Sequence, residues 1–161
     1  MTEQTDLTPQ DVSRALELQA IYLHECHVTR GDAEHATPGT VDGDIAITFT
    51  QDEPGVVLYL VNVTTGLHNS DSHLMARIET TFAALYEIEG AGLSEEDLKS
   101  YEATVRYQIH PYLRETLASL TNRMGLPTFT APVLQARTQM PPEDVAAAGV
   151  FKTPASSQSV S

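Results

Sequence analysis

The pattern of apolar and polar residues along the first half of the chain predicts four β-strands. In a half-buried strand every second side chain faces the core, and three stretches follow this rule: residues 17–30, 44–50 and 74–89. The fourth strand is predicted over residues 56–65, which begin with a continuous apolar run. Turn signals rich in Gly, Asp and Pro separate them, so we expect an antiparallel meander. In the first stretch the side chains expected on one face are Leu18, Ala20, Tyr22, Cys26 and Val28, with His24 among them.

Helix-capping signals stand on both sides of the predicted sheet. The run Thr8-Pro9-Gln10-Asp11 combines an N-cap Thr, Pro at the first helical position and an acid in the first turn, which predicts a short helix near 9–16. After the last strand, Ser94 and Asp97 have capping-box spacing, with Asp in place of the usual Glu, and predict the start of a second helix.

A proline and a leucine stripe shape the prediction for the helical half. Because proline is disfavoured inside a helix, Pro111 is expected to end the helix that starts near Ser94 and to begin another. Gly125 and Pro127 stand where that helix should stop. The apolar residues that recur at helical spacing between these signals are Leu113, Leu117, Leu120 and Met124.

The order of the elements predicts an α+β class, with a four-stranded antiparallel sheet followed by two helices. We expect an N-terminal extension over 1–17, a folded domain over 18–134 and a tail over 135–161 that holds one weak helix and then disorder. Two helices cover only one face of a sheet well. The strand over 56–65 is apolar on both faces at its start, so further cover from a homo-oligomer is expected.

Charge and composition narrow the kinds of partner. The net charge is −13, and residues 1–54 carry eleven acids against two bases. Nucleic acid and anionic membranes need basic surface and are disfavoured as partners; the acidic third is interpreted as a solubility face, or else as a docking face for a basic partner. The chain has no apolar run near the ~20 residues of a membrane span, no secretory signal at its polar start and one cysteine. A soluble, cytoplasmic protein is expected.

The reactive side chains do not form a known catalytic or metal-binding motif. His24, Cys26 and His27 are the most metal-like cluster, but alternation on a strand keeps them from converging as zinc requires. The sequence has no glycine-rich phosphate loop and no nucleophile elbow. We therefore expect no enzyme activity, cofactor or metal. The remaining alternative is a small-ligand protein with a polar pocket at His24, Cys26 or His110.

One stretch of the helical half resembles the SecB family of export chaperones. The family's helix begins Pro-Tyr-x-Arg-Glu, with a small or polar residue four past the Glu and an Arg four further on; here these are Pro111, Tyr112, Arg114, Glu115, Ser119 and Arg123. An apolar-Pro step at 126–127 and Ala-Pro-Val at 131–133 follow as in the family, and Ile21-Tyr22 is similar to the opening of its first strand. The resemblance covers about residues 18–134.

This resemblance implies both an assembly and a function. SecB proteins have a sheet-then-helices subunit and assemble as a tetramer, a dimer of dimers with the helices between two sheets. They bind unfolded polypeptides without ATP and keep them competent for export. By resemblance we expect a homotetrameric holdase whose partners are unfolded client polypeptides.

The resemblance also bears on two named partners. Proteobacterial members dock the SecA motor through acids on the sheet. Here Glu25 and Glu79 are the candidate docking residues, whereas Arg77 and Thr29 stand where those members carry acids, which argues against SecA. The N-terminal extension and an insertion at 92–99 are similar to the SecB-like chaperones of actinobacteria and their phages. Some of these hold an aggregation-prone antitoxin, so a dedicated antitoxin chaperone is the alternative function.

Client binding is expected where the start of the leucine-rich helix and the following extended segment meet the sheet. The candidate peptide-binding residues are Tyr112, Leu113, Leu126, Phe129 and Val133, and their alternative role is ordinary core packing. Leu117, Leu120 and Met124 are expected to pack subunits together, and the thioether of Met124 also suits an adaptable binding surface.

Overall fold

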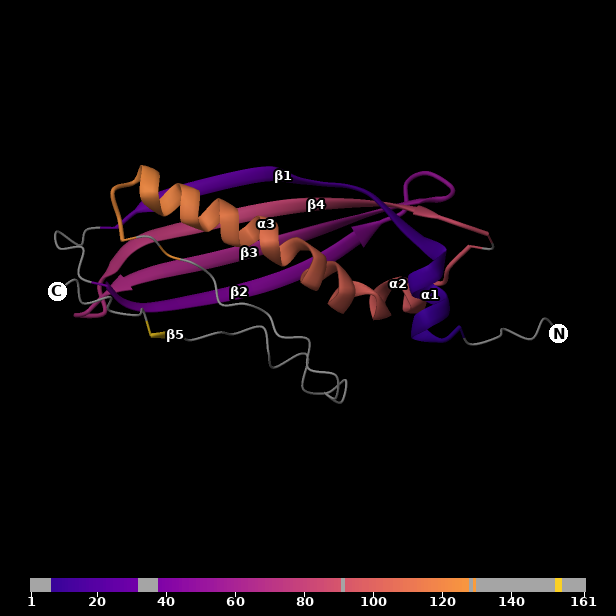
Figure 1. Cartoon of the computed structure of the whole chain (residues 1–161), viewed down its shortest axis with the longest axis horizontal. Helices are drawn as coiled ribbons and strands as arrows, with labels where there is room; N and C mark the ends of the chain where they lie inside the picture. The colour runs from indigo at the N-terminus through magenta and orange to yellow at the C-terminus, as the bar shows by residue number, and fades with distance from the viewer. Residues whose placement is uncertain (1–6, 32–37, 91, 128, 130–152, 155–161) are drawn as a thin grey trace.

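A computed structural model describes residues 7–31, 38–90, 92–127, 129 and 153–154, and Figure 1 shows their arrangement. The elements follow one another as α1 (Pro9–Ala15), β1 (Leu16–Arg30), β2 (Pro38–Thr50), β3 (Val56–Asn69), β4 (Leu74–Ile88), α2 (Glu95–Ser100), α3 (Glu102–Arg123) and the short β5 (Thr153–Pro154). The α+β class and the four main strands are as predicted. The expected helix near 141–149 lies outside the described residues.

The sheet has the strand order β1-β4-β3-β2-β5, and all neighbouring strands are antiparallel. The expected meander holds for β2, β3 and β4 but is wrong for β1, which pairs with β4 instead of β2. A central place suits β4 because it is buried on both faces: Ala84 and Tyr86 on one side, Met75 and Ala83 on the other. In this central place β4 pairs with β1 on one edge and with β3 on the other, and side chains of both neighbours flank its buried residues.

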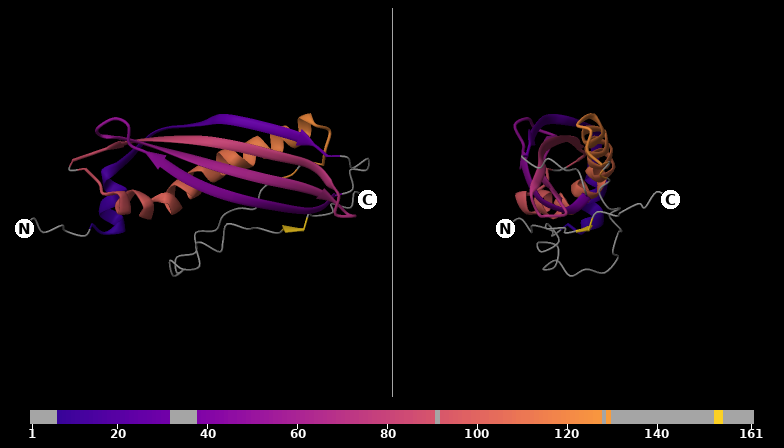
Figure 2. Two further views of the ribbon diagram at one scale, coloured as in Figure 1. Left: turned by 180° about the vertical axis from the view of Figure 1, so that it is seen from behind. Right: turned by 90° about the vertical axis from the view of Figure 1, so that its left-hand side faces the viewer.

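Of the described helices, the short α1 and α2 lie at one end of the sheet, and α3 starts there and runs obliquely across one face (Figure 2). This is called the helix side below, and the opposite face the outer side. The core lies between the helices and the helix side of the sheet. It contains the helix-side residues of β3 and β4 together with a stripe of α3. That stripe consists of Val105, Ile109, Leu113, Leu117 and Thr121. None of the described helices is long and apolar enough to cross a membrane.

The helix starts predicted at Thr8 and Ser94 are confirmed. At α1 the Thr8 hydroxyl accepts a hydrogen bond from the Asp11 N–H, and the Asp11 carboxylate accepts one from the Thr8 N–H in return. The Thr8 hydroxyl also donates to the Asp11 carboxylate, and this bond, with the one from the Thr8 N–H, holds the pKa of Asp11 below its usual range. Ser94 and Asp97 form the same reciprocal capping box at α2. Both boxes satisfy N–H groups that a helix end otherwise leaves unpaired.

The expected break at Pro111 is wrong. The helix that starts after Ser94 is α2, and it ends at Ser100. Tyr101 separates α2 from α3, and Pro111 lies inside α3. Proline removes the hydrogen bond to the carbonyl four residues earlier, here that of Tyr107. Pro111 and Tyr107 are both exposed, on the side of α3 away from the sheet, so water can hydrate the carbonyl and the helix continues.

Replacing Pro111 with alanine is expected to raise the free energy of unfolding by about 1–3 kcal/mol, because alanine is the better helix former and restores the missing donor. Urea denaturation measures the change. Ser119→Ala, at another exposed position of α3, is the control and should change the free energy of unfolding by no more than about 0.5 kcal/mol. A less stable Pro111→Ala variant would contradict this account.

Two strands are longer than predicted. The stretch 31–43 is expected to be a loop because of its glycines, yet β2 begins at Pro38, and β3 continues to Asn69. At Gly39 a Cβ atom would lie 2.0 Å from the carbonyl oxygen of Asn69. Here glycine permits the close approach of two paired backbones. In the sequence alone, a glycine with this role looks the same as a glycine in a turn.

Candidate functional site

Strand β1 contains two β-bulges that change which side chains reach the helix side. Its register with β4 shifts between Leu18 and Ala20 and again between Leu23 and Glu25, leaving Gln19 and then His24 as the extra residues. Each extra residue reverses the alternation that follows. The single face expected from the sequence is therefore wrong: Ala20 and Tyr22 lie on the outer side.

The helix side of β1 carries a row of exposed apolar side chains. Leu18, Leu23 and Val28 pair with the buried β4 residues Tyr86, Phe82 and Ile78, which places all six on the same face. Yet the three β1 side chains are 37%, 44% and 40% exposed. Half-buried Ile21 and Cys26 lie in the same row. We call the five residues Leu18, Ile21, Leu23, Cys26 and Val28 the β1 strip.

The strip is exposed because β1 is the edge strand and α3 covers mainly the strands beside it. Near its start α3 is fixed to β4 by a hydrogen bond between the Tyr86 hydroxyl and the Gln108 side chain. Only toward its end does α3 approach β1, where the Arg30 guanidinium donates to the Met124 carbonyl. Between these two points the helix side of β1 is only partly covered, since Leu18, Leu23 and Val28 remain exposed while Ile21 packs against the core.

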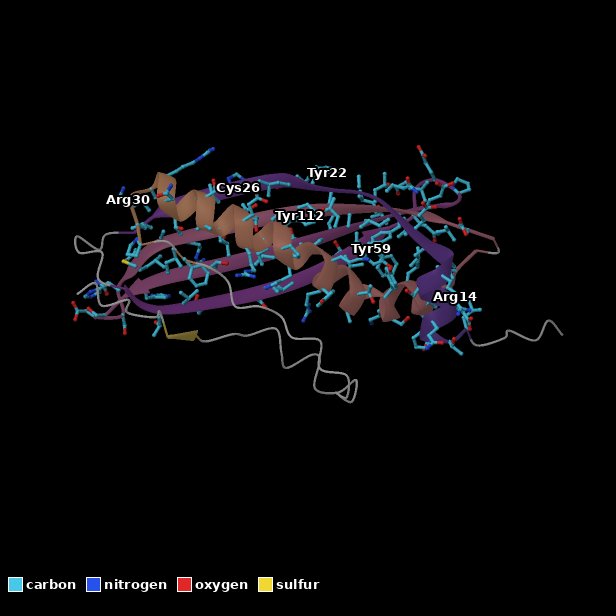
Figure 3. The ribbon with its side chains drawn as sticks, in the orientation of Figure 1. Arg14, Tyr22, Cys26, Arg30, Tyr59 and Tyr112 are labelled. Atoms are coloured by element: carbon cyan, nitrogen blue, oxygen red, sulfur yellow. The ribbon has the colours of Figure 1, made fainter. Side chains whose placement is uncertain are left out.

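Tyr112 extends this apolar surface onto α3. It lies one turn after Gln108 and therefore on the same flank of the helix, the flank that faces β4 and β1. Tyr112 is 45% exposed. In Figure 3 Tyr112 lies on the side of α3 toward β1. An exposed phenol on this flank suits apolar side chains and one hydrogen bond.

The other expected peptide-binding residues occupy different environments. Leu113 is buried in the core, which is the alternative role weighed for it. Leu126 and Phe129 are half-buried against the core, and the Phe129 N–H donates to the Thr121 hydroxyl. Val133 lies outside the described residues.

Among the residues expected to pack subunits together, Leu117 is wholly buried within its own subunit. Its burial therefore needs no second copy of the chain, and its place is in the core. Leu120 and Met124 are half-buried and pack against that core. Part of each side chain remains at the surface, so both stay candidates for a subunit contact.

The side chains weighed for metal binding, His24, Cys26 and His27, do not form a metal site. Within the described part of the chain, no three His, Cys, Asp or Glu side chains are arranged to hold a metal ion. Burial raises the pKa of Cys26, which disfavours the reactive thiolate. Burial likewise raises the pKa of Tyr59 and of Tyr86, so these phenols stay protonated within the core.

The two acids weighed for motor docking lie together on the outer side. Glu25 and Glu79 both line a polar hollow of about 230 Å³. The full lining is Glu25, His27, Asn62, Val63, Thr64, Glu79, Thr80 and Thr81. The His27 ring nitrogen Nε2 lies 2.8 Å from the Glu25 carboxylate, and Arg77 pairs with Thr29 in the neighbouring row. This surface is of mixed charge and not uniformly acidic.

Comparison with known proteins identifies the fold. No protein-family model and no curated protein sequence matches the chain. Among solved structures, the Mycobacterium tuberculosis SecB-like chaperone Rv1957, in complex with a ChAD peptide from the Rv1956 HigA1 antitoxin, has a TM-score of 0.70 and 23% identity, over 79% of this chain and 96% of that one. A Streptococcus agalactiae protein of unknown function has a TM-score of 0.42 and 14% identity, over 73% and 96% of the two chains, too low to carry an argument. The chain thus has the fold of SecB-like proteins, as its helix motif predicts.

Proposed function

We propose that this chain is an ATP-independent holdase chaperone that binds unfolded or non-native polypeptides, works as a homotetramer and keeps its clients competent for export. The single observation that carries the proposal is the β1 strip together with Tyr112. An exposed apolar row on an otherwise well-packed domain needs an occupant. The SecB-like fold supports a polypeptide as that occupant.

The physics of such binding matches a client of variable sequence. Burying apolar surface contributes roughly 25 cal/mol per Å² and needs no fixed hydrogen-bond pattern. The strip offers several separate leucine-sized contacts along one strand, so an extended segment can place different side chains on it. Repeating a weak site around a tetramer raises the overall affinity through effective concentration.

A narrower function has one specific observation in its favour. The structure that resembles this chain holds a peptide from an antitoxin, so a chaperone dedicated to one antitoxin is the second candidate. A dedicated chaperone would select a few related peptides from an array of diverse sequences, whereas a general holdase would bind many apolar ones.

The mixed charge around Glu25, Glu79 and Arg77 gives no support to SecA docking, so SecA is not included in the proposal.

Two matched variants test which side of β1 binds the client. Leu23 and Tyr22 are neighbours of similar exposure, 44% and 47%, but Leu23 lies on the helix side and Tyr22 on the outer side. Leu23→Ser is expected to weaken capture of an aggregating unfolded client about fivefold, since roughly 1 kcal/mol of apolar burial is lost. Tyr22→Ser, the matched control, should leave capture unchanged.

The measurement is suppression of client aggregation by light scattering, with the client complex confirmed on a sizing column. If the unaltered chain neither suppresses aggregation nor forms a complex, the holdase proposal is wrong. If Tyr22→Ser weakens capture and Leu23→Ser does not, the chaperone binds its clients on the outer side instead.

A further inference from the structure

The flank of α3 that faces away from the β1 strip carries a row of basic side chains. Arg106, His110 and Arg114 each follow a core residue of α3 by one position, whereas Gln108 and Tyr112 each precede one. Residues before and after the same core stripe lie on opposite flanks of a helix. Since the Gln108 flank faces β4 and β1, the row faces β3 and β2, which lie on the other side of α3 from β1 in Figure 1. We call these three residues the basic flank.

The two arginines of the basic flank have no anionic partner within the described part of the chain. No described carboxylate forms an ion pair with Arg106 or Arg114, not even that of Glu102, which lies one turn before Arg106. The Nε atom of each arginine is enclosed and has no hydrogen-bond partner among the described residues. Both guanidinium charges are therefore partly removed from water without being neutralised, a state that costs free energy.

The sheet surface that the basic flank faces supplies no negative charge. On the helix side, β2 and β3 present paired apolar and aromatic residues: Ile45 with Val63, Ile47 with Val61 and Phe49 with Tyr59. An apolar surface nearby also reduces the screening of a charge by water. An unpaired guanidinium in these surroundings favours a ligand that carries a carboxylate, which it can bind through charge-assisted hydrogen bonds.

We propose that Arg106 and Arg114 bind Asp or Glu side chains of a client whose apolar residues occupy the β1 strip. The proposal rests on the proposed function, and it adds a class of client sequence. The strip and the basic flank lie on opposite sides of α3, and a helix with its side chains is about 10 Å across. An extended chain rises about 3.3 Å per residue. The acids must therefore lie roughly three or more residues from the apolar anchor, whichever path the client takes.

The test uses the full chain and three synthetic peptides that are blocked at both ends. Each has the same leucine-rich segment and the same serine spacer, longer than the width of a helix, followed by a run of glutamates, glutamines or lysines. The glutamate peptide is expected to bind about fivefold more tightly than the glutamine peptide, because it gains two partly exposed ion pairs. The lysine peptide should bind most weakly. The net charge of −13 by itself predicts the opposite order, so the order measured by calorimetry decides between a local site and general attraction.

Matched variants locate the preference on the basic flank. Arg106→Gln combined with Arg114→Gln should abolish the preference for glutamate and leave the affinity for the glutamine peptide unchanged, which also shows that the variant is folded. Arg123→Gln, at an exposed position of the same helix, removes a positive charge elsewhere and should keep the preference.

Equal or reversed binding of the glutamate and glutamine peptides would overturn the proposal, and so would a preference that survives the double variant. Both results are distinct from failure of the holdase function, in which none of the three peptides binds and no unfolded client is captured.

Discussion

Tyr59→Ala is expected to lower the free energy of unfolding by about 3–5 kcal/mol, the usual cost of removing a large aromatic side chain from a core. Tyr59 is wholly buried. Its ring centroid lies 5.5 Å from those of Phe49 and Tyr86 and 6.4 Å from that of Tyr101, so this one side chain joins three strands to the start of the helical layer. Since a domain is stable by only about 5–15 kcal/mol, the variant should lose a large share of its stability.

Tyr59→Phe separates the hydroxyl from the ring. The Tyr59 hydroxyl donates to the Leu98 carbonyl at 2.7 Å and so ties α2 to the sheet. Loss of this one hydrogen bond should cost about 1 kcal/mol, with the ring packing kept. Denaturant unfolding followed by circular dichroism measures both variants. Equal costs for the two would show that the hydroxyl, and not the ring, carries the contribution of Tyr59.

Leu117→Ala is expected to lower the free energy of unfolding by about 2–5 kcal/mol, because the leucine is fully enclosed and its removal leaves a cavity. Leu120→Ala, in the same helix but half-buried, is the matched control with a smaller cost. Denaturant unfolding together with native mass makes the measurement. If Leu117→Ala lowered the native mass while the stability of the subunit stayed unchanged, Leu117 would belong to a subunit interface instead of the core.

Much of the fold could be predicted because its signals are local. Strand alternation, the Thr8 and Ser94 caps and the stop at Gly125 each depend on a few neighbouring residues. The failures depend on distant ones. The pairing of β1 with β4 follows from how well β4 is covered, and the place of Pro111 follows from which side of α3 faces water. Neither can be read from a single stretch of sequence.

The candidate site was predicted only in part for the same reason. Tyr112 lies at the exposed surface where the helix motif led us to expect binding. Strand alternation places Leu18 and Val28 on one face of their strand and gives them no binding role, and regular alternation would put Leu23 on the opposite face. The extra residues Gln19 and His24 carry no compositional signal of a bulge. A periodicity rule therefore sees one regular strand, and the β1 strip becomes visible only through its pairing with β4.

The bulge at His24 makes β1 tolerant of one change in length at that point. If the His24 codon alone were lost, Leu23 and Glu25 would become adjacent, and ordinary alternation would keep Leu23 on the helix side and Glu25 on the outer side. Val28 would stay opposite Ile78, and the apolar row would survive the loss of the bulge. Loss of a residue elsewhere in β1, with the bulge kept, would instead turn over the part of the strand beyond it and bring charged side chains into that row. A gap at the bulge therefore preserves the surface of a related chain, whereas a gap beside it changes that surface without any substitution.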